Sequence, residues 1–156
     1  MFSYTRLTFS RSDNLRKVNY IIGSVVLTNG NLFKLSDGSV WSAENPGHVR
    51  SSLRIVIILN SQLRKGSAFV QGKEINVEHI SGNFTYYNGY YSKVIGREDK
   101  GAVLLTEDGS GWSVPDYERT DASKWQPPYN VLITSDGLFM LNLDKNERII
   151  ISRRNR

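Results

Sequence analysis

Two copies of one short pattern decide the fold: "KLSDGSVWS" at residues 34–42 and "LTEDGSGWS" at residues 105–113, 71 positions later. Both contain Asp-Gly-Ser-x-Trp-Ser. Asp-Gly provides the positive φ that tight hairpin turns require, so each copy predicts a β-hairpin. A single hairpin with one apolar face is not stable alone, and we therefore expect two related units that pack together.

The remaining turn signals extend this pattern along the chain. Five Asn-Gly or Asp-Gly pairs lie between runs rich in Val, Ile, Leu, Tyr or Phe: Asn29-Gly30, Asp37-Gly38, Asn88-Gly89, Asp108-Gly109 and Asp136-Gly137. Such spacing predicts a meander of short strands joined by two-residue turns. Only residues 115–125 could hold a helix, and a short one. We expect an all-β fold in which two hairpin-plus-strand units form a compact barrel-like or sandwich domain with a projecting hairpin.

The predicted organisation has four parts. A chain of 156 residues suits one domain or two very small ones. The parts are a basic N-terminal segment, a first β unit, a second β unit and a basic C-terminal tail, at residues 1–17, 18–81, 82–152 and 153–156.

A two-residue turn also predicts which side chains face each other. In the second copy Leu105 would face Trp112, with Val114 on the same side, so this hairpin would have an apolar face anchored by the indole. In the first copy the same register would place Lys34 opposite Trp41. We expect these aliphatic and indole side chains to be structural.

The second half of the chain also resembles small β-domain proteins and repeats of bacterial and phage genomes that have no assigned activity. The pattern is L-x-x-D-G-S-x-W-x-V, a tyrosine, W-x-P, V-x-I and "NLD". Its residues are Leu105, Asp108, Gly109, Ser110, Trp112, Val114, Tyr117, Trp125, Pro127, Val131, Ile133, Asn142, Leu143 and Asp144. The first copy matches through Leu35, Asp37, Gly38, Ser39 and Trp41. The resemblance implies a β fold and transfers no catalytic residue.

No pattern in the chain indicates catalysis, a metal site or a cofactor. There is no cysteine, and the two histidines, His48 and His79, are 31 residues apart. Ser39 and Ser110 follow Asp-Gly but do not lie in G-x-S-x-G, and we interpret them as turn residues. We therefore expect a protein that is not an enzyme and has no catalytic residue, metal or cofactor.

One apolar stretch needs to be weighed as a targeting signal. Residues 18–27, "VNYIIGSVVL", follow two basic residues, but Asn19, Tyr20 and Gly23 interrupt the run. It is also too short to span a bilayer. We expect no membrane association, and a location in the cytoplasm of the native or a host cell, with incorporation into a virion as a further option.

Charge is unevenly distributed along the chain. The net charge is +5, but residues 1–17 carry +3, residues 145–156 carry +4 and residues 98–144 carry −6. This polarity favours head-to-tail contact between copies or with protein neighbours. The basic ends also suit phosphate contacts with nucleic acid. The predicted charged contacts are Arg11, Arg16, Lys17, Arg153, Arg154 and Arg156.

The segment "FTYYNGYYSKV" at residues 84–94 is the predicted projecting hairpin. With Asn88-Gly89 as its turn, Tyr87 would oppose Tyr90 on one face and Tyr86 would oppose Tyr91 on the other. Tyrosine provides a large contact area with a polar tip, so we interpret these residues as partner-binding.

These observations predict a non-enzymatic structural or interaction protein of a larger assembly. The specific form of the hypothesis is a bacteriophage virion accessory protein, either a head-tail connector or a tail component. The alternative is a nucleic-acid-binding small β-barrel. A small-ligand or carbohydrate-binding module comes third, based on Trp41, Trp112 and Trp125.

Overall fold

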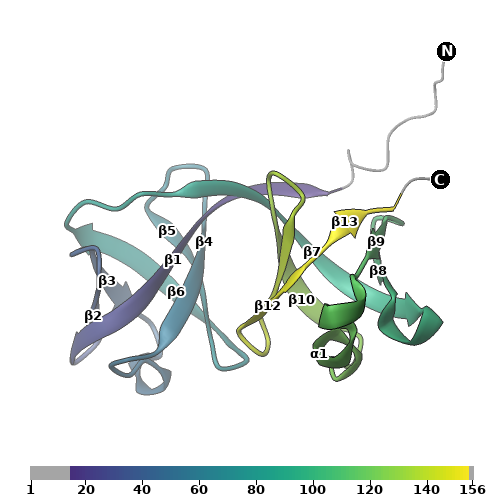
Figure 1. Cartoon of the computed structure of the whole chain (residues 1–156). Coiled ribbons are helices and arrows are strands. Elements are labelled where there is room, and N and C mark those ends of the chain that lie inside the picture. Colours follow the sequence, from purple (N-terminus) through teal and green to yellow (C-terminus); the bar gives the residue numbers. More distant parts are fainter. Residues whose placement is uncertain (1–14, 155–156) are drawn as a thin grey trace, which may run out of the picture. The chain divides into compact units, whose positions relative to one another are not determined.

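Strands dominate the computed structural model of the chain, which describes residues 15–154. These residues divide into two units (Figure 1). The N-terminal unit contains Val18–Gly89 and Leu143–Asn146, and the C-terminal unit contains residues 15–17, Tyr90–Asn142 and residues 147–154. The predicted all-β fold class is confirmed.

The N-terminal unit is a closed antiparallel barrel of six strands. The strands are β1 (Arg16–Asn29), β2 (Leu32–Leu35), β3 (Val40–Ala43), β4 (Arg54–Leu59), β5 (Lys65–Val70) and β6 (Lys73–Ser81), with a short 3₁₀ helix at Pro46–His48. Their order is β1-β2-β3-β6-β5-β4, and β4 pairs with β1 to close the barrel. Because closure pairs every strand on both sides, this barrel has no exposed edge.

The C-terminal unit repeats the same strand order. Its strands are β7 (Tyr87–Glu98), β8 (Val103–Thr106), β9 (Gly111–Ser113), β10 (Tyr129–Thr134), β11 (Phe139–Asn142), β12 (Glu147–Ile150) and β13 (Ser152–Arg153). β7, β8 and β9 form one meander, β10, β11 and β12 form another, and β7 neighbours β10. β13 continues from β12 and pairs with β9, in the way that β6 pairs with β3. Each unit therefore consists of two three-stranded meanders.

The connections of the C-terminal unit contain its helices. Short 3₁₀ helices lie at Asp99–Gly101 and Asp116–Glu118, and α1 spans Arg119–Ser123. The short helix expected within residues 115–125 is confirmed by the last two of these elements, whereas the 3₁₀ helices at Pro46–His48 and Asp99–Gly101 were not expected.

Each unit encloses its own hydrophobic core. The N-terminal core is built around Trp41, with Phe33, Ile55, Ile57 and Ile75 among its members. The C-terminal core is built around Trp112 and Trp125, with Leu104, Val131, Ile133 and Ile149 among its members. Strands rich in Val and Ile fill both interiors, because β-branched side chains pack well on a pleated surface.

The predicted register of the two hairpins is wrong by one residue. Trp41 is opposite Phe33, and Trp112 is opposite Leu104. Leu105 is therefore half-buried on the outer side of its strand rather than beside Trp112. A backbone hydrogen bond between Leu35 and Ser39 closes the first loop around residues 36–38, and one between Thr106 and Ser110 closes the second around residues 107–109. Within each set of three residues only the glycine has a positive φ. A three-residue loop with glycine in the left-handed region replaces the expected two-residue turn.

The side chains of the repeated pattern explain this loop. Asp37 accepts hydrogen bonds from the backbone N–H and hydroxyl of Ser39, and the indole of Trp41 donates to the Ser39 hydroxyl at 2.9 Å. In the second copy Asp108 accepts from Ser110 in the same way. The repeated Asp, Ser and Trp thus connect each turn to its barrel core.

The projecting tyrosine hairpin is not present. Asn88 and Gly89 lie inside β7, which continues without a turn from Tyr87 to Glu98, and Gly89 is buried. Asn-Gly is only a local preference. The continuous pairing of a long strand with its neighbours outweighs it, since a turn here would remove those backbone hydrogen bonds.

Candidate protein-interaction surface

Three exposed aliphatic side chains come from bulges in the strands. Val26 is the extra residue where β1 shifts register against β2, Ile95 is the extra residue of β7 against β8, and Ile80 is the extra residue of β6 against β3. Each is at least half exposed. A β-bulge changes the direction of a side chain, which explains why these apolar residues leave the core side of their strands.

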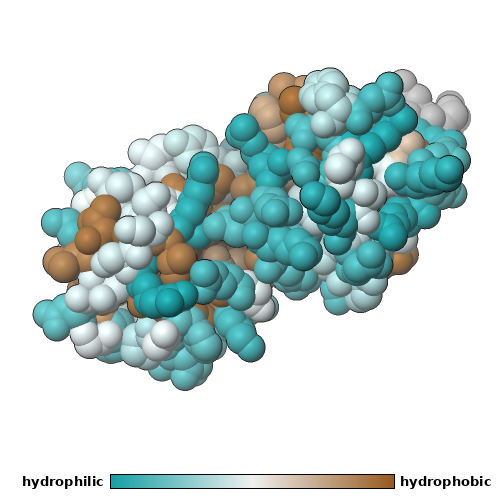
Figure 2. Space-filling model, turned by 60° about the horizontal axis from the view of Figure 1, so that its bottom comes forward, coloured by the Kyte–Doolittle hydropathy of each residue, from teal (hydrophilic) through white to brown (hydrophobic). Residues whose placement is uncertain are grey.

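Two of these bulges border one outer face of the N-terminal barrel. Leu27 pairs with Lys34, Lys34 pairs with Val40, and Val40 pairs with the residue after Ile80. We call this surface the Lys34 face: Val26, Leu27, Lys34, Val40 and Ile80. Figure 2 shows apolar surface in several places on the body that carries β2, β3 and β6, among neighbours of intermediate or hydrophilic character.

The Lys34 face joins four apolar side chains around one ammonium group. Leu27 and Ile80 are 59% and 52% exposed, and Val40 is half-buried. Among the described residues, Lys34 is in none of the ion pairs. Clustered apolar side chains at a charged centre are more typical of a contact surface than of solvent-facing sheet.

This face was missed in the sequence. The signal was "SVVLT", in which Val25, Val26 and Leu27 are three consecutive apolar residues in a strand. Strict alternation allows only the first and third to share a side, so such a run indicates a bulge or a strand covered on both faces.

The four predicted partner-binding tyrosines divide into two kinds. Tyr86 and Tyr87 are 44% and 53% exposed. Tyr90 packs against the C-terminal core, and the Tyr91 hydroxyl donates to Asn130 at 3.3 Å. The predicted cross-strand pairs are therefore wrong, because all four residues follow one another on or next to a single strand.

The predicted basic contacts are engaged to different degrees. The Arg16 guanidinium lies 5.5 Å from the centre of the Tyr91 ring, and Lys17 is exposed. Arg153 lies over the Trp112 ring and donates to Ser110, and Arg154 forms an ion pair with Glu98 at 3.0 Å. Arg11 and Arg156 lie outside the described residues.

The three tryptophans are not available to stack on a ligand. Trp41 and Trp125 are fully buried and Trp112 is 3% exposed. The hypothesis of a small-ligand or carbohydrate-binding module therefore gains no support from these tryptophans. The indole N–H groups are also used inside the units, for example by the bond from Trp125 to Glu147 at 2.6 Å.

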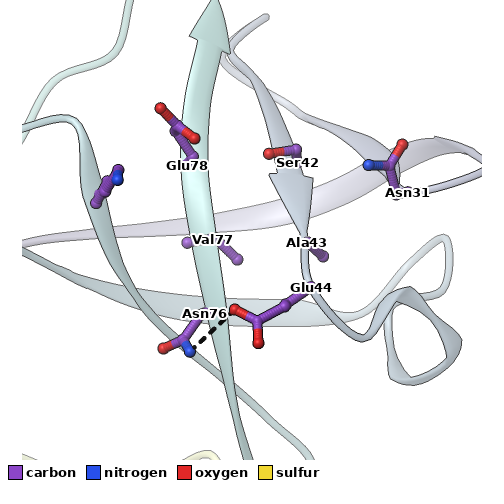
Figure 3. Close-up of a pocket in the computed structure, with 8 residues that line it drawn as sticks. Asn31, Ser42, Ala43, Glu44, Asn76, Val77 and Glu78 are labelled. Carbon is purple, nitrogen blue, oxygen red and sulfur yellow. Dashed lines mark hydrogen bonds between the residues drawn. The ribbon is translucent and has the colours of Figure 1, made fainter.

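A polar pocket of about 280 Å³ lies on the outer side of the N-terminal barrel (Figure 3). Its walls come from β3, β5, β6 and the turn after β1: Asn31, Ser42, Ala43, Glu44, Lys65, Asn76, Val77 and Glu78. The Asn76 amide donates to Glu44 at 3.2 Å, and Glu78 pairs with Arg64 at 3.1 Å. The polar groups of this pocket therefore partly satisfy one another.

The Tyr129 hydroxyl and the Asp136 carboxyl have shifted pKa values, and neither lies on the Lys34 face. Burial raises the pKa of the Tyr129 hydroxyl above its usual value, against a smaller opposite effect of Arg97. Hydrogen bonds from the Thr134 hydroxyl and the Leu138 backbone N–H lower the pKa of Asp136. Both residues have structural positions, in the core and in the turn before β11.

The described residues contain no cluster of three or more His, Asp or Glu side chains placed to hold a metal ion. Within residues 15–154 no helix is long and apolar enough to cross a membrane. The hydroxyls of Ser39 and Ser110 are bonded to carboxylates of their own turns. Comparison of the chain with protein-family models, curated proteins and solved structures finds no match.

Proposed function

We propose that this chain is a non-enzymatic interaction protein of a larger assembly. The observation that carries the proposal is the Lys34 face, where four apolar side chains surround one ammonium group on an otherwise closed barrel. Burying such a surface against a neighbour would remove apolar area from water, at about 25 cal/mol per Å².

The specific role that we propose is an accessory component of a bacteriophage virion, at the head-tail junction or in the tail. Two small units with independent cores and the uneven charge along the chain support a part that contacts several protein neighbours. Quantitative mass spectrometry of purified virions would test this role. A fixed copy number per particle is expected, and absence from the particles would contradict the virion role alone.

The interaction role is tested by photo-crosslinking in the cell that produces the protein. A photoreactive amino acid at Leu27 is expected to give discrete adducts with protein neighbours. The matched control is the same amino acid at Tyr117, which is 74% exposed and lies outside the face. Equal or absent adducts at both positions would contradict the proposed function.

Nucleic-acid binding remains the second candidate, because Arg16 stacks on Tyr91 next to the exposed Lys17. A cation beside an aromatic ring suits the backbone and bases of a single strand. Fluorescence anisotropy with a single-stranded oligonucleotide tests it. Binding that weakens in Arg16→Gln and falls steeply with salt would support this candidate.

A further inference from the structure

The same bulge occurs at the same place in both units. Val26 interrupts the pairing of β1 with β2, and Ile95 interrupts the pairing of β7 with β8. In both cases the residue before the bulge pairs with the residue that closes the Asp-Gly-Ser loop, Leu35 in the first unit and Thr106 in the second. The two bulges are therefore equivalent positions of the repeated fold.

Both bulges expose a β-branched apolar side chain. Val26 is 50% exposed and Ile95 is 56% exposed. A single exposed aliphatic residue needs no explanation. Here a bulge with an exposed β-branched residue recurs at equivalent positions of two units whose neighbouring residues differ. This recurrence favours a common role in binding.

The surroundings of the two bulges differ in charge. Lys34 occupies the centre of the N-terminal face and pairs with the residue that follows the Val26 bulge. In the C-terminal unit Leu105 pairs with the residue that follows the Ile95 bulge, so Leu105 is the structural equivalent of Lys34. Leu105 is half-buried on the outer side of β8. An apolar residue thus occupies the position that Lys34 has in the other unit.

The C-terminal face adds a carboxylate at its border. Glu107 is two residues after Leu105, is exposed, and donates its backbone N–H to the Lys93 carbonyl. It is in none of the ion pairs among the described residues. Lys93, Glu107 and Asp108 together carry a formal charge of −1, so this border is negative overall. We call Ile95, Leu105 and Glu107 the Glu107 face.

We propose that the Lys34 face of one copy binds the Glu107 face of a second copy, so that chains associate head to tail. This inference rests on the proposed function and names the neighbour. Apolar residues from both bulges would be buried between the copies, with Lys34 placed toward Glu107. A two-fold contact between identical Lys34 faces is disfavoured, because it would bring the positively charged Lys34 side chains of the two copies close together.

The test uses two variants that each block one face. Val26→Asp blocks the Lys34 face and Ile95→Asp blocks the Glu107 face. Because both residues are exposed, both variants are expected to keep the wild-type circular dichroism spectrum and melting temperature. Analytical ultracentrifugation measures the masses across a hundredfold range of concentration.

The wild type is expected to grow beyond a dimer as concentration rises, while each variant alone stays monomeric. An equimolar mixture of the two variants should form dimers and nothing larger, because each retains one intact and opposite face. A dimer formed by Ile95→Asp alone would show a two-fold contact and overturn the inference. A monomeric wild type would also overturn it, and crosslinking at Leu27 to a different protein would still support the proposed function.

A charge exchange tests the pairing of Lys34 with Glu107. Lys34→Glu and Glu107→Lys should each weaken association about tenfold, and a mixture of the two variants should recover it. Lys73→Glu is the matched control, since Lys73 is exposed on β6 outside the face. Equal weakening by the control, or no recovery in the mixture, would contradict the pairing.

Discussion

Single side chains connect the repeated pattern to the cores, and the two indoles are the clearest case. Trp41 and Trp112 occupy equivalent places, each opposite an apolar residue of the preceding strand. Their indole N–H groups reach different acceptors, Ser39 in one unit and Thr106 in the other. The requirement is a satisfied buried donor rather than one particular partner.

Truncation of either indole should be costly. Trp112→Ala removes a side chain that is 3% exposed and leaves a cavity, so we expect a loss of about 3–5 kcal/mol in the free energy of unfolding. Urea denaturation followed by circular dichroism measures it. Trp41→Ala should have a similar cost, and a change below about 1 kcal/mol in either variant would show that the indole does not anchor its unit.

A second residue gives a prediction of the opposite sign. The Tyr129 hydroxyl is buried and has no hydrogen-bond partner among the described residues. Removing an unsatisfied buried hydroxyl also removes its desolvation penalty. Tyr129→Phe should therefore leave the free energy of unfolding unchanged or raise it by about 1 kcal/mol. A clear loss of stability in the same urea titration would reveal a partner for the hydroxyl.

At the scale of elements, the turn between β10 and β11 depends on one carboxylate. Asp136 accepts hydrogen bonds from the Thr134 hydroxyl and the Leu138 N–H, and these bonds lower its pKa. A pKa lower in the folded than in the unfolded state adds stability above the unfolded pKa. That stability is lost as pH falls through the folded pKa.

Thr134→Val should raise the pKa of Asp136 toward its usual value, because the hydroxyl bond is the largest cause of the shift. Titration of the side-chain carboxyl carbon by NMR measures this change. The variant should also lose less stability than the wild type as the solution is acidified. Ser135→Ala is the control, since this exposed neighbour forms none of those bonds. An unchanged pKa in Thr134→Val would contradict the assignment.

The long strand β7 separates two kinds of tyrosine. Tyr90 packs against the C-terminal core, whereas Tyr86 precedes the strand and is 44% exposed. Tyr90→Ala should lower the free energy of unfolding by more than about 1 kcal/mol, and Tyr86→Ala by less than about 0.5 kcal/mol. Differential scanning calorimetry compares them. Equal effects would favour a turn at Asn88 over the continuous strand.

At the scale of the whole molecule, the duplication was predictable and its details were not. Asp-Gly-Ser-x-Trp-Ser identified two hairpins, because its turn and core residues are local to each hairpin. Loop length was not readable, since Asp and Ser side chains select a three-residue loop through hydrogen bonds that composition does not reveal. The turn predicted at Asn88 failed because strand pairing is decided by neighbours distant in sequence.

The candidate site was less predictable than the fold. Exposed tyrosines and basic ends were visible by composition, but the two bulge faces depend on register shifts between paired strands. A register shift depends on how two strands pair, so the sequence of either strand alone indicates it only weakly. The run of apolar residues ending at Leu27 was that signature.

At this scale, the salt dependence of DNA binding distinguishes the proposed protein interaction from nucleic-acid binding. The net charge of +5 should allow weak binding to duplex DNA at low salt. Arg153 is held on Trp112 and Ser110, and Arg154 is held on Glu98, so neither is expected to contribute a phosphate contact. Anisotropy titrations of the double variant Arg153→Gln/Arg154→Gln should therefore give the wild-type dependence of log K on log salt.

A slope smaller by about 1.8, at about 0.9 per lost contact, would instead place both arginines on the phosphate backbone. That result would favour the nucleic-acid candidate, because it would require both arginines to leave intramolecular partners in order to bind DNA.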